Sequence, residues 1–155
     1  MIGGIDSSVL LIYIRNIVFI ICAIFVIYND FKYYIIPDYI TFTLFPLGIM
    51  FSYFTGNPYL ISSVLTGLIS FLFFFLIAYV YEKKYKEIGL GGGDIKYIAS
   101  IGAFWGFDGL VIILLLSSFL ALICYLGLYF LKKRVQYLPY GVFLALAGCG
   151  WAILH

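Results

Sequence analysis

Long apolar stretches, separated by short polar junctions, set the pattern of this chain. Apolar residues fill about 9–28, 39–54, 59–81, 110–131 and a last stretch from about 138 to 154, and a shorter stretch rich in small residues covers 95–104. A helix needs about 20 predominantly apolar residues to cross a bilayer, and the first stretch has that length. The pattern predicts an all-α, polytopic membrane protein of about six transmembrane helices, with residues 1–155 forming a single domain.

The polar junctions predict where these helices end. Pro37 cannot continue a helix, so Asp38 is the expected N-cap of the second one, in which Pro46 is expected to introduce a kink. Turns are expected at 55–58 and 106–109 because both are rich in turn-forming residues. Arg15 lies early in the first apolar stretch, and we expect its long side chain to snorkel toward the membrane surface.

Composition supports the membrane assignment and excludes several other classes. The chain has 155 residues, of which 65% are hydrophobic and 10% charged, whereas soluble domains have about 45–50% apolar residues. No basic patch lies outside the loops, which argues against nucleic-acid binding. The three cysteines are far apart and form no C-x-x-C pair, so neither a zinc site nor a disulfide framework is expected. No metal and no cofactor is predicted.

The basic residues predict the orientation of the helices. With six spans, the loops after the first, third and fifth share one side, and these loops with their borders hold Lys32, Lys83, Lys84, Lys86, Lys96, Lys132, Lys133 and Arg134. Because cytoplasmic loops carry an excess of Lys and Arg, this side is expected in the cytoplasm and both termini outside. The chain would be a multi-pass protein of the cell membrane.

Two acidic residues fall at this same cytoplasmic end. Asp30 closes the first apolar stretch and Asp94 opens the fourth, and acids at membrane depth are costly enough to be functional candidates. Two adjacent carboxylates share a proton, so that one can activate a water while the other polarises a carbonyl. The only histidine is the terminal His155, which leaves a Ser–His or Cys–His arrangement without a base. The pair therefore predicts aspartyl-protease chemistry.

Glycines surround the second acid. Residues 89–96 read Gly-Leu-Gly-Gly-Gly-Asp-Ile-Lys, and glycine permits close approach of another segment because it has no Cβ. An approachable backbone beside an acid suits a protease that holds an extended substrate. The alternative reading is a plain loop in which Asp94 only caps a helix.

At these residues the chain resembles the type IV prepilin peptidases, a family of membrane aspartyl proteases with a Gly-x-Gly-Asp signature. The first family motif, Asp, six residues, then Pro and Asp or Asn, matches Asp30 with Pro37 and Asp38. The second motif, Gly-x-Gly-x-Gly-Asp-x-Lys, matches Gly89, Gly91, Gly93, Asp94 and Lys96. A closing Pro-aromatic-Gly is also similar to residues 139–141. The resemblance covers most of the chain, from about residue 26 to its end.

This resemblance implies a function and leaves alternatives open. Asp30 and Asp94 would be catalytic, and the motif glycines with Pro37, Asp38 and Lys96 would support them or bind substrate. The substrate would be the short basic leader of a prepilin-like or archaellin-like precursor, cleaved at the cytoplasmic face, with the lipid bilayer as the surroundings. The chain lacks the N-terminal segment with two C-x-x-C pairs found in many bacterial members, so it resembles the compact members and N-methyltransferase activity is not supported.

Other classes share parts of this pattern. Presenilin-like and signal-peptide-peptidase-like proteases carry Gly-x-Gly-Asp but are larger, with a different motif around their first acid. A small transporter that uses Asp30 and Asp94 as proton or cation sites is the non-enzyme alternative. The oligomeric state stays open, a homo-oligomer included.

Overall fold

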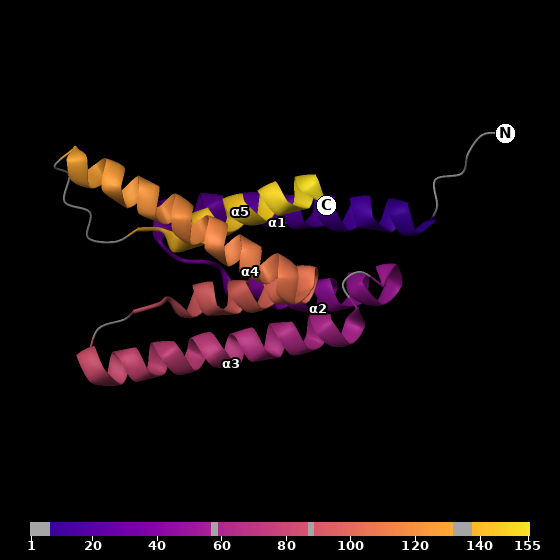
Figure 1. Ribbon diagram of the computed structural model, residues 1–155, viewed down its shortest axis with the longest axis horizontal. Helices are drawn as coiled ribbons and strands as arrows, with labels where there is room; N and C mark the ends of the chain where they lie inside the picture. The colour runs from indigo at the N-terminus through magenta and orange to yellow at the C-terminus, as the bar shows by residue number, and fades with distance from the viewer. Residues whose placement is uncertain (1–6, 57–58, 87–88, 132–137) are drawn as a thin grey trace.

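The computed structural model describes residues 7–56, 59–86, 89–131 and 138–155, and in these the chain forms helices joined by short connections (Figure 1). The helices are α1 (Ser7–Tyr33), α2 (Asp38–Thr55), α3 (Leu60–Tyr85), α4 (Gly92–Phe130) and α5 (Tyr140–Leu154). No strand occurs in the described ranges, which confirms the all-α prediction. The basic residues 132–134 and part of the predicted turn at 55–58 lie outside these ranges.

Three of the described helices, α1, α3 and α4, are long and apolar enough to cross a membrane. Helix α5 is a shorter apolar helix of 15 residues. The predicted number of six spans is therefore not confirmed, although the apolar, helical character of the chain is.

Helix α4 is broken at Gly106, where the backbone takes φ 64° and ψ −166°. This positive φ is accessible to glycine because it has no Cβ, and the chain reverses direction there (Figure 1). The break lies in the predicted turn at 106–109. Successive helical segments consequently alternate in direction, so that the connections after α1 and α3 lie at the same end of the bundle as the start of α5.

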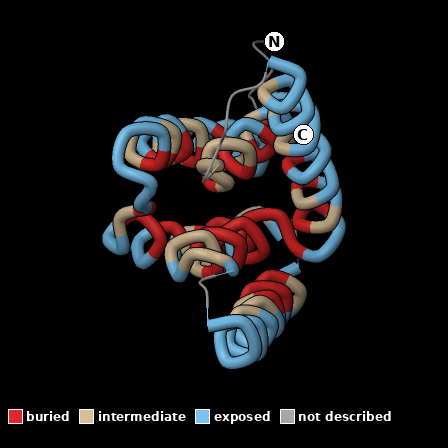
Figure 2. Tube along the Cα trace, turned by 90° about the vertical axis from the view of Figure 1, so that its left-hand side faces the viewer, coloured by how far each residue is buried: buried red, intermediate tan, exposed pale blue. Residues whose placement is uncertain are grey.

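The first half of α4 forms the centre of the bundle. Helix α4 packs against α2, α3 and α5, while α1 packs against α2 and α5. Buried residues face the middle of the bundle and exposed residues face outward (Figure 2). The outward residues are largely apolar, as lipid-facing positions would be.

Small residues on α4 permit the close packing that the sequence predicted. A Cβ on Gly102 would lie 3.1 Å from Thr66 Cγ2 of α3, and the Ser63 hydroxyl of α3 donates a hydrogen bond to the Ala103 carbonyl. On the other side, a Cβ on Gly48 of α2 would lie only 2.8 Å from the Phe104 backbone nitrogen. Bulkier residues at these positions would separate the helices.

Arg15 does not snorkel, so that prediction is wrong. Its side chain is buried, with 2% exposed, and its guanidinium lies 4.3 Å from the centre of the Trp105 ring. Arg15 Nε also donates to Asn16 Oδ1, and Asn16 Nδ2 donates to the Ala152 carbonyl in the last turn of α5. Inside the bundle, Arg15 is stabilised by the Trp105 ring of α4 and by Asn16, which in turn is bonded to α5.

The predicted N-cap at Asp38 is also wrong. Asp38 is the first residue of α2, Pro37 occupies the N-cap position, and no side chain caps this helix. Helix α2 continues through Pro46 as one helix. The first helix extends beyond the predicted end at residue 28 to Tyr33, which places Asp30 inside its last turn.

Candidate active site

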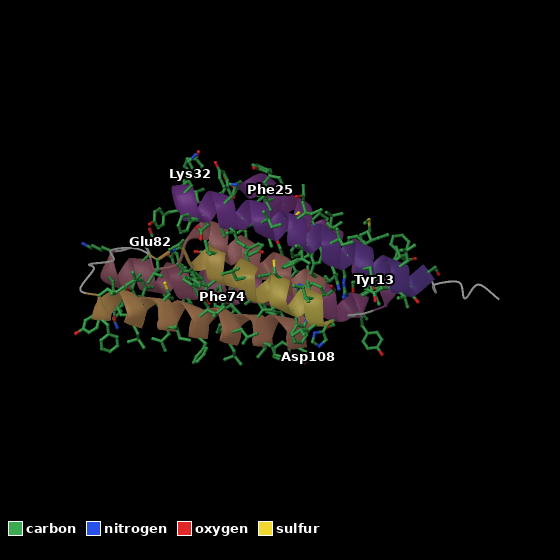
Figure 3. All side chains as sticks on the ribbon, turned by 90° about the horizontal axis from the view of Figure 1, so that it is seen from above. Tyr13, Phe25, Lys32, Phe74, Glu82 and Asp108 are labelled. Carbon is green, nitrogen blue, oxygen red and sulfur yellow. The ribbon has the colours of Figure 1, made fainter. Side chains whose placement is uncertain are left out.

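Asp30 and Asp94 line the same cleft, which has a volume of about 460 Å³ and lies where the connections after α1 and α3 meet. The remaining lining comes from the segment after α1 and from the glycine stretch: Tyr34, Ile35, Ile36, Pro37, Asp38, Gly91, Gly92 and Gly93. Lys32 and Glu82 mark this end of the bundle and Asp108 marks the other (Figure 3). The topology thus brings together two acids that are 64 residues apart in sequence.

Asp30 is held in the last turn of α1. Helix α1 ends at Tyr33, and Tyr34 takes a left-handed conformation with φ 55°, in which its N–H donates to the Asp30 carbonyl at 3.0 Å. The Asp30 side chain is 5% exposed, and its Oδ2 accepts a hydrogen bond from the Val142 N–H at 3.0 Å. This partner belongs to α5, 112 residues further along the chain.

Asp94 lies in the first turn of α4, and Gly91 occupies the N-cap position. Asp94 is therefore not the N-cap residue of the alternative reading, although its carboxylate lies beside the Gly91 backbone. The Asp94 side chain is half-buried and lines the same cleft as Asp30. Two carboxylates that meet in one cleft can hold one proton between them.

The glycine stretch lies tightly against its surroundings at some positions and freely at others. A Cβ on Gly93 would lie 3.0 Å from Ile36 Cβ, and one on Gly91 would lie 3.0 Å from Asp94 Oδ2. A Cβ on Gly89 would lie 2.6 Å from the Tyr81 ring, whereas one on Gly92 would meet no atom within 4 Å. Gly91 is therefore packed against Asp94 and Gly93 against Ile36, whereas Gly92 is open.

Lys96 and Asp38 connect the two sequence motifs. Lys96 Nζ lies 2.6 Å from Asp38 Oδ1, which joins the first turn of α2 to the first turns of α4 at the edge of the cleft. Both side chains are partly exposed to the surroundings. The ion pair thus links the start of α2 to the start of α4 beside the cleft.

We expect Asp38→Ala and Lys96→Ala to lower cleavage of a precursor by up to about fivefold each, because exposed ion pairs contribute at most about 1 kcal/mol. The double variant should lose no more than either single variant, since each already abolishes the same contact. Turnover rates in matched membrane preparations measure this, with Glu82→Ala as the control at the same end of the bundle. Additive losses in the double variant would show that the two residues act separately.

Two parts of this site were missed by the sequence reasoning. Ile36, which is 4% exposed, contacts both the glycine stretch and α5, and its only signal in the sequence was its position directly before Pro37. The Pro-Tyr-Gly sequence at 139–141, which resembles a closing family motif but carries no predicted role, leads into the helix that contacts Asp30.

Among the described residues, no group of three or more His, Cys, Asp or Glu side chains could hold a metal ion. Cys22, Cys124 and Cys149 are free and partly buried within the helices. The polar groups that line the cleft include the carboxylates of Asp30 and Asp94, the backbone of the glycine stretch, and Asp38, which is paired with Lys96.

Residues 17–126 match the sequence model of the type IV leader peptidase family. The chain is similar to prepilin leader peptidase/N-methyltransferases: 32% identical over 116 residues to that of Aeromonas salmonicida, and 33% identical over 140 residues to that of Vibrio cholerae. These alignments cover 74% and 88% of this chain but only 40% and 52% of the two relatives. No solved structure matches the chain.

Proposed function

Since this chain belongs to the type IV leader peptidase family, we propose that it is an aspartic endopeptidase that cleaves the leader of prepilin-like precursors. The observation that carries the proposal is the shared cleft of Asp30 and Asp94, which lie on different helices inside the residues that match the family. Paired carboxylates can hydrolyse a peptide bond, and peptidase activity is therefore the activity proposed.

The reaction would use the two carboxylates in complementary forms. One ionised carboxylate accepts a proton from a water molecule, which attacks the scissile carbonyl, while the other carboxyl group donates a proton toward the carbonyl oxygen. The tetrahedral intermediate then collapses as the leaving amine takes up a proton, and the leader is released. Asp30 and Asp94 are the residues proposed for these roles.

The glycine stretch would hold the substrate. Peptide bonds are cleaved in an extended chain, and an extended chain needs backbone partners of its own. Gly91 and Gly93 line the cleft and carry no side chains, which leaves their backbone approachable. A basic leader would also be attracted to the carboxylates of the cleft.

We place the cleft at the cytoplasmic face of the cell membrane, with both termini on the opposite side. The support is the concentration of basic residues around the connections at the end that contains the cleft, together with the excess of Lys and Arg usual in cytoplasmic loops. Archaellin-like precursors, which share the same kind of leader, remain within this proposal.

A cleavage assay in proteoliposomes tests the function. The purified protein is mixed with a precursor that carries a short basic leader ahead of an apolar segment, and the products are weighed by mass spectrometry. We expect a precursor shortened by its leader in vesicles that contain the protein and an intact precursor in empty vesicles. A protein that leaves the precursor intact but moves protons or cations, as a dye inside the vesicles would show, would instead be the transporter alternative.

A further inference from the structure

The start of α5 reaches the cleft through its backbone. Val142 N–H donates to Asp30 Oδ2 at 3.0 Å, and a Cβ on Gly141 would lie 2.8 Å from the same oxygen. These residues lie outside the 17–126 segment that matches the family. The contact therefore adds a third element to the site, beyond the two motifs that carry the aspartates.

Helix geometry explains why these amides are available. The first four N–H groups of a helix have no acceptor within the helix, and α5 begins at Tyr140. Gly141 and Val142 are its second and third residues, so both can donate to an outside group without the loss of a helical hydrogen bond. The amino-terminal end of a helix also carries partial positive charge, which suits a carboxylate partner.

The close approach of α5 depends on Gly141. A Cβ at this position would lie 2.8 Å from Asp30 Oδ2 and 2.6 Å from Ile36 Cδ1. At these distances the Ile36 side chain or the Asp30 carboxylate would have to shift. Glycine at 141 is thus what lets the helix end touch the carboxylate.

A second contact fixes the start of α5 laterally. The Tyr140 hydroxyl lies 3.2 Å from the Ser117 hydroxyl and 3.2 Å from the Ser118 hydroxyl, both in the second half of α4. Helix α5 is therefore held by α4 on one side and by Asp30 on the other. Its first turn has little freedom to rotate away from the cleft.

We propose that the first turn of α5 positions Asp30 for catalysis, through the Val142 N–H and the missing side chain of Gly141. The Val142 amide occupies Oδ2 and so fixes the carboxylate plane, which leaves Oδ1 for the water or the shared proton. Val142 is a positioning residue and touches no substrate. The inference rests on the proposed peptidase function and assigns a role to the Pro-Tyr-Gly sequence at 139–141.

The test compares Val142→Pro with Val142→Ala. Proline lacks the N–H but is tolerated in the first turn of a helix, whereas alanine keeps the N–H and removes only side-chain atoms. We expect Val142→Pro to lower kcat about 10- to 100-fold relative to Val142→Ala, because a hydrogen bond to a charged group contributes about 1.5–3 kcal/mol. KM should change less than about threefold. Misfolding would lower the amount of active protein and so the apparent kcat. Thermal unfolding of each variant in detergent monitors this.

Gly141→Ala provides a second variant that keeps every N–H group. Its methyl group is pushed against Asp30, so we expect a loss of kcat similar to that in Val142→Pro. Gly150→Ala is the matched control on the same helix, since a Cβ there meets no atom within 4 Å. If Val142→Pro does not fold, the comparison of Gly141→Ala with Gly150→Ala decides the question by itself.

Infrared spectra of protein labelled with ¹³C-aspartate test the contact without any substrate. The difference spectrum between Val142→Ala and Val142→Pro should contain a carboxyl band that disappears when the same pair carries Asp30→Asn. Equal kcat for the two variants in a protein that cleaves its precursor would overturn the inference alone. A wild-type protein that cleaves no precursor would overturn the proposed function, and the catalytic role of the contact with it, even where the infrared band is present.

Discussion

Asp30→Asn and Asp94→Asn are each expected to reduce leader cleavage by about 10²- to 10⁴-fold, the range that general acid–base groups contribute. Asparagine has nearly the shape of aspartate, but it neither accepts a proton from water nor donates one to a carbonyl oxygen at neutral pH. The replacement removes an ionisable group at membrane depth, so insertion should not suffer. Rates of precursor shortening, measured at equal amounts of inserted protein, give the effect directly.

The double variant and a remote aspartate serve as controls. Asp30→Asn combined with Asp94→Asn should be no slower than either single variant, because residues that act as a unit are not additive. Asp108→Asn changes an exposed acid at the opposite end of the bundle and should leave cleavage unchanged. Cleavage by the Asp94→Asn protein at more than about a tenth of the wild-type rate would contradict the dyad.

The fold could be predicted where a local signal decides the structure. The apolar stretches predicted the helices, and the turn residues at 106–109 predicted the reversal at Gly106, which depends on the positive φ of one glycine. The small residues of 95–104 predicted the close packing of α4, because side-chain size acts directly at an interface between helices. Each of these features depends on residues adjacent in sequence.

The fold could not be predicted where a distant partner decides it. Arg15 reads as a snorkelling residue because the Trp105 ring and the Ala152 carbonyl that accompany it are contributed by α4 and α5. Asp38 reads as an N-cap because its partner Lys96 is 58 residues away. In both cases tertiary contacts replaced the local role that sequence position suggested.

The same distinction applies to the cleft. The helical stretches and the basic loops placed Asp30 and Asp94 at one end of the bundle, and the structure places both in one cleft. The contact of Val142 with Asp30 could not be foreseen, because a backbone N–H leaves no trace in residue identity. The only sequence signal of this contact is Gly141, where a side chain would clash with the neighbouring Ile36.

Ile36 also determines how the glycine stretch should respond to mutation. Its Cβ lies against Gly93 and its Cδ1 against Gly141, so this buried side chain is wedged between the start of α4 and the start of α5. A methyl group on Gly93 would be 3.0 Å from Ile36 Cβ and 3.2 Å from the Ile36 carbonyl oxygen, both of which are tighter than ordinary contacts. Either the Ile36 backbone or the first turn of α4, which carries Asp94, would have to shift.

We therefore expect Gly93→Ala to reduce kcat about 10- to 100-fold, because displacement of a catalytic group by as little as 1 Å can cost two orders of magnitude. Gly91→Ala should have a similar effect, since its methyl group would press on Asp94 Oδ2. Gly92→Ala is the matched control: its Cβ meets nothing within 4 Å, and alanine is the better helix former by about 1 kcal/mol. Cleavage rates of the three variants at matched membrane expression measure the difference, and near-wild-type rates for all three would show that the glycines serve only as a linker.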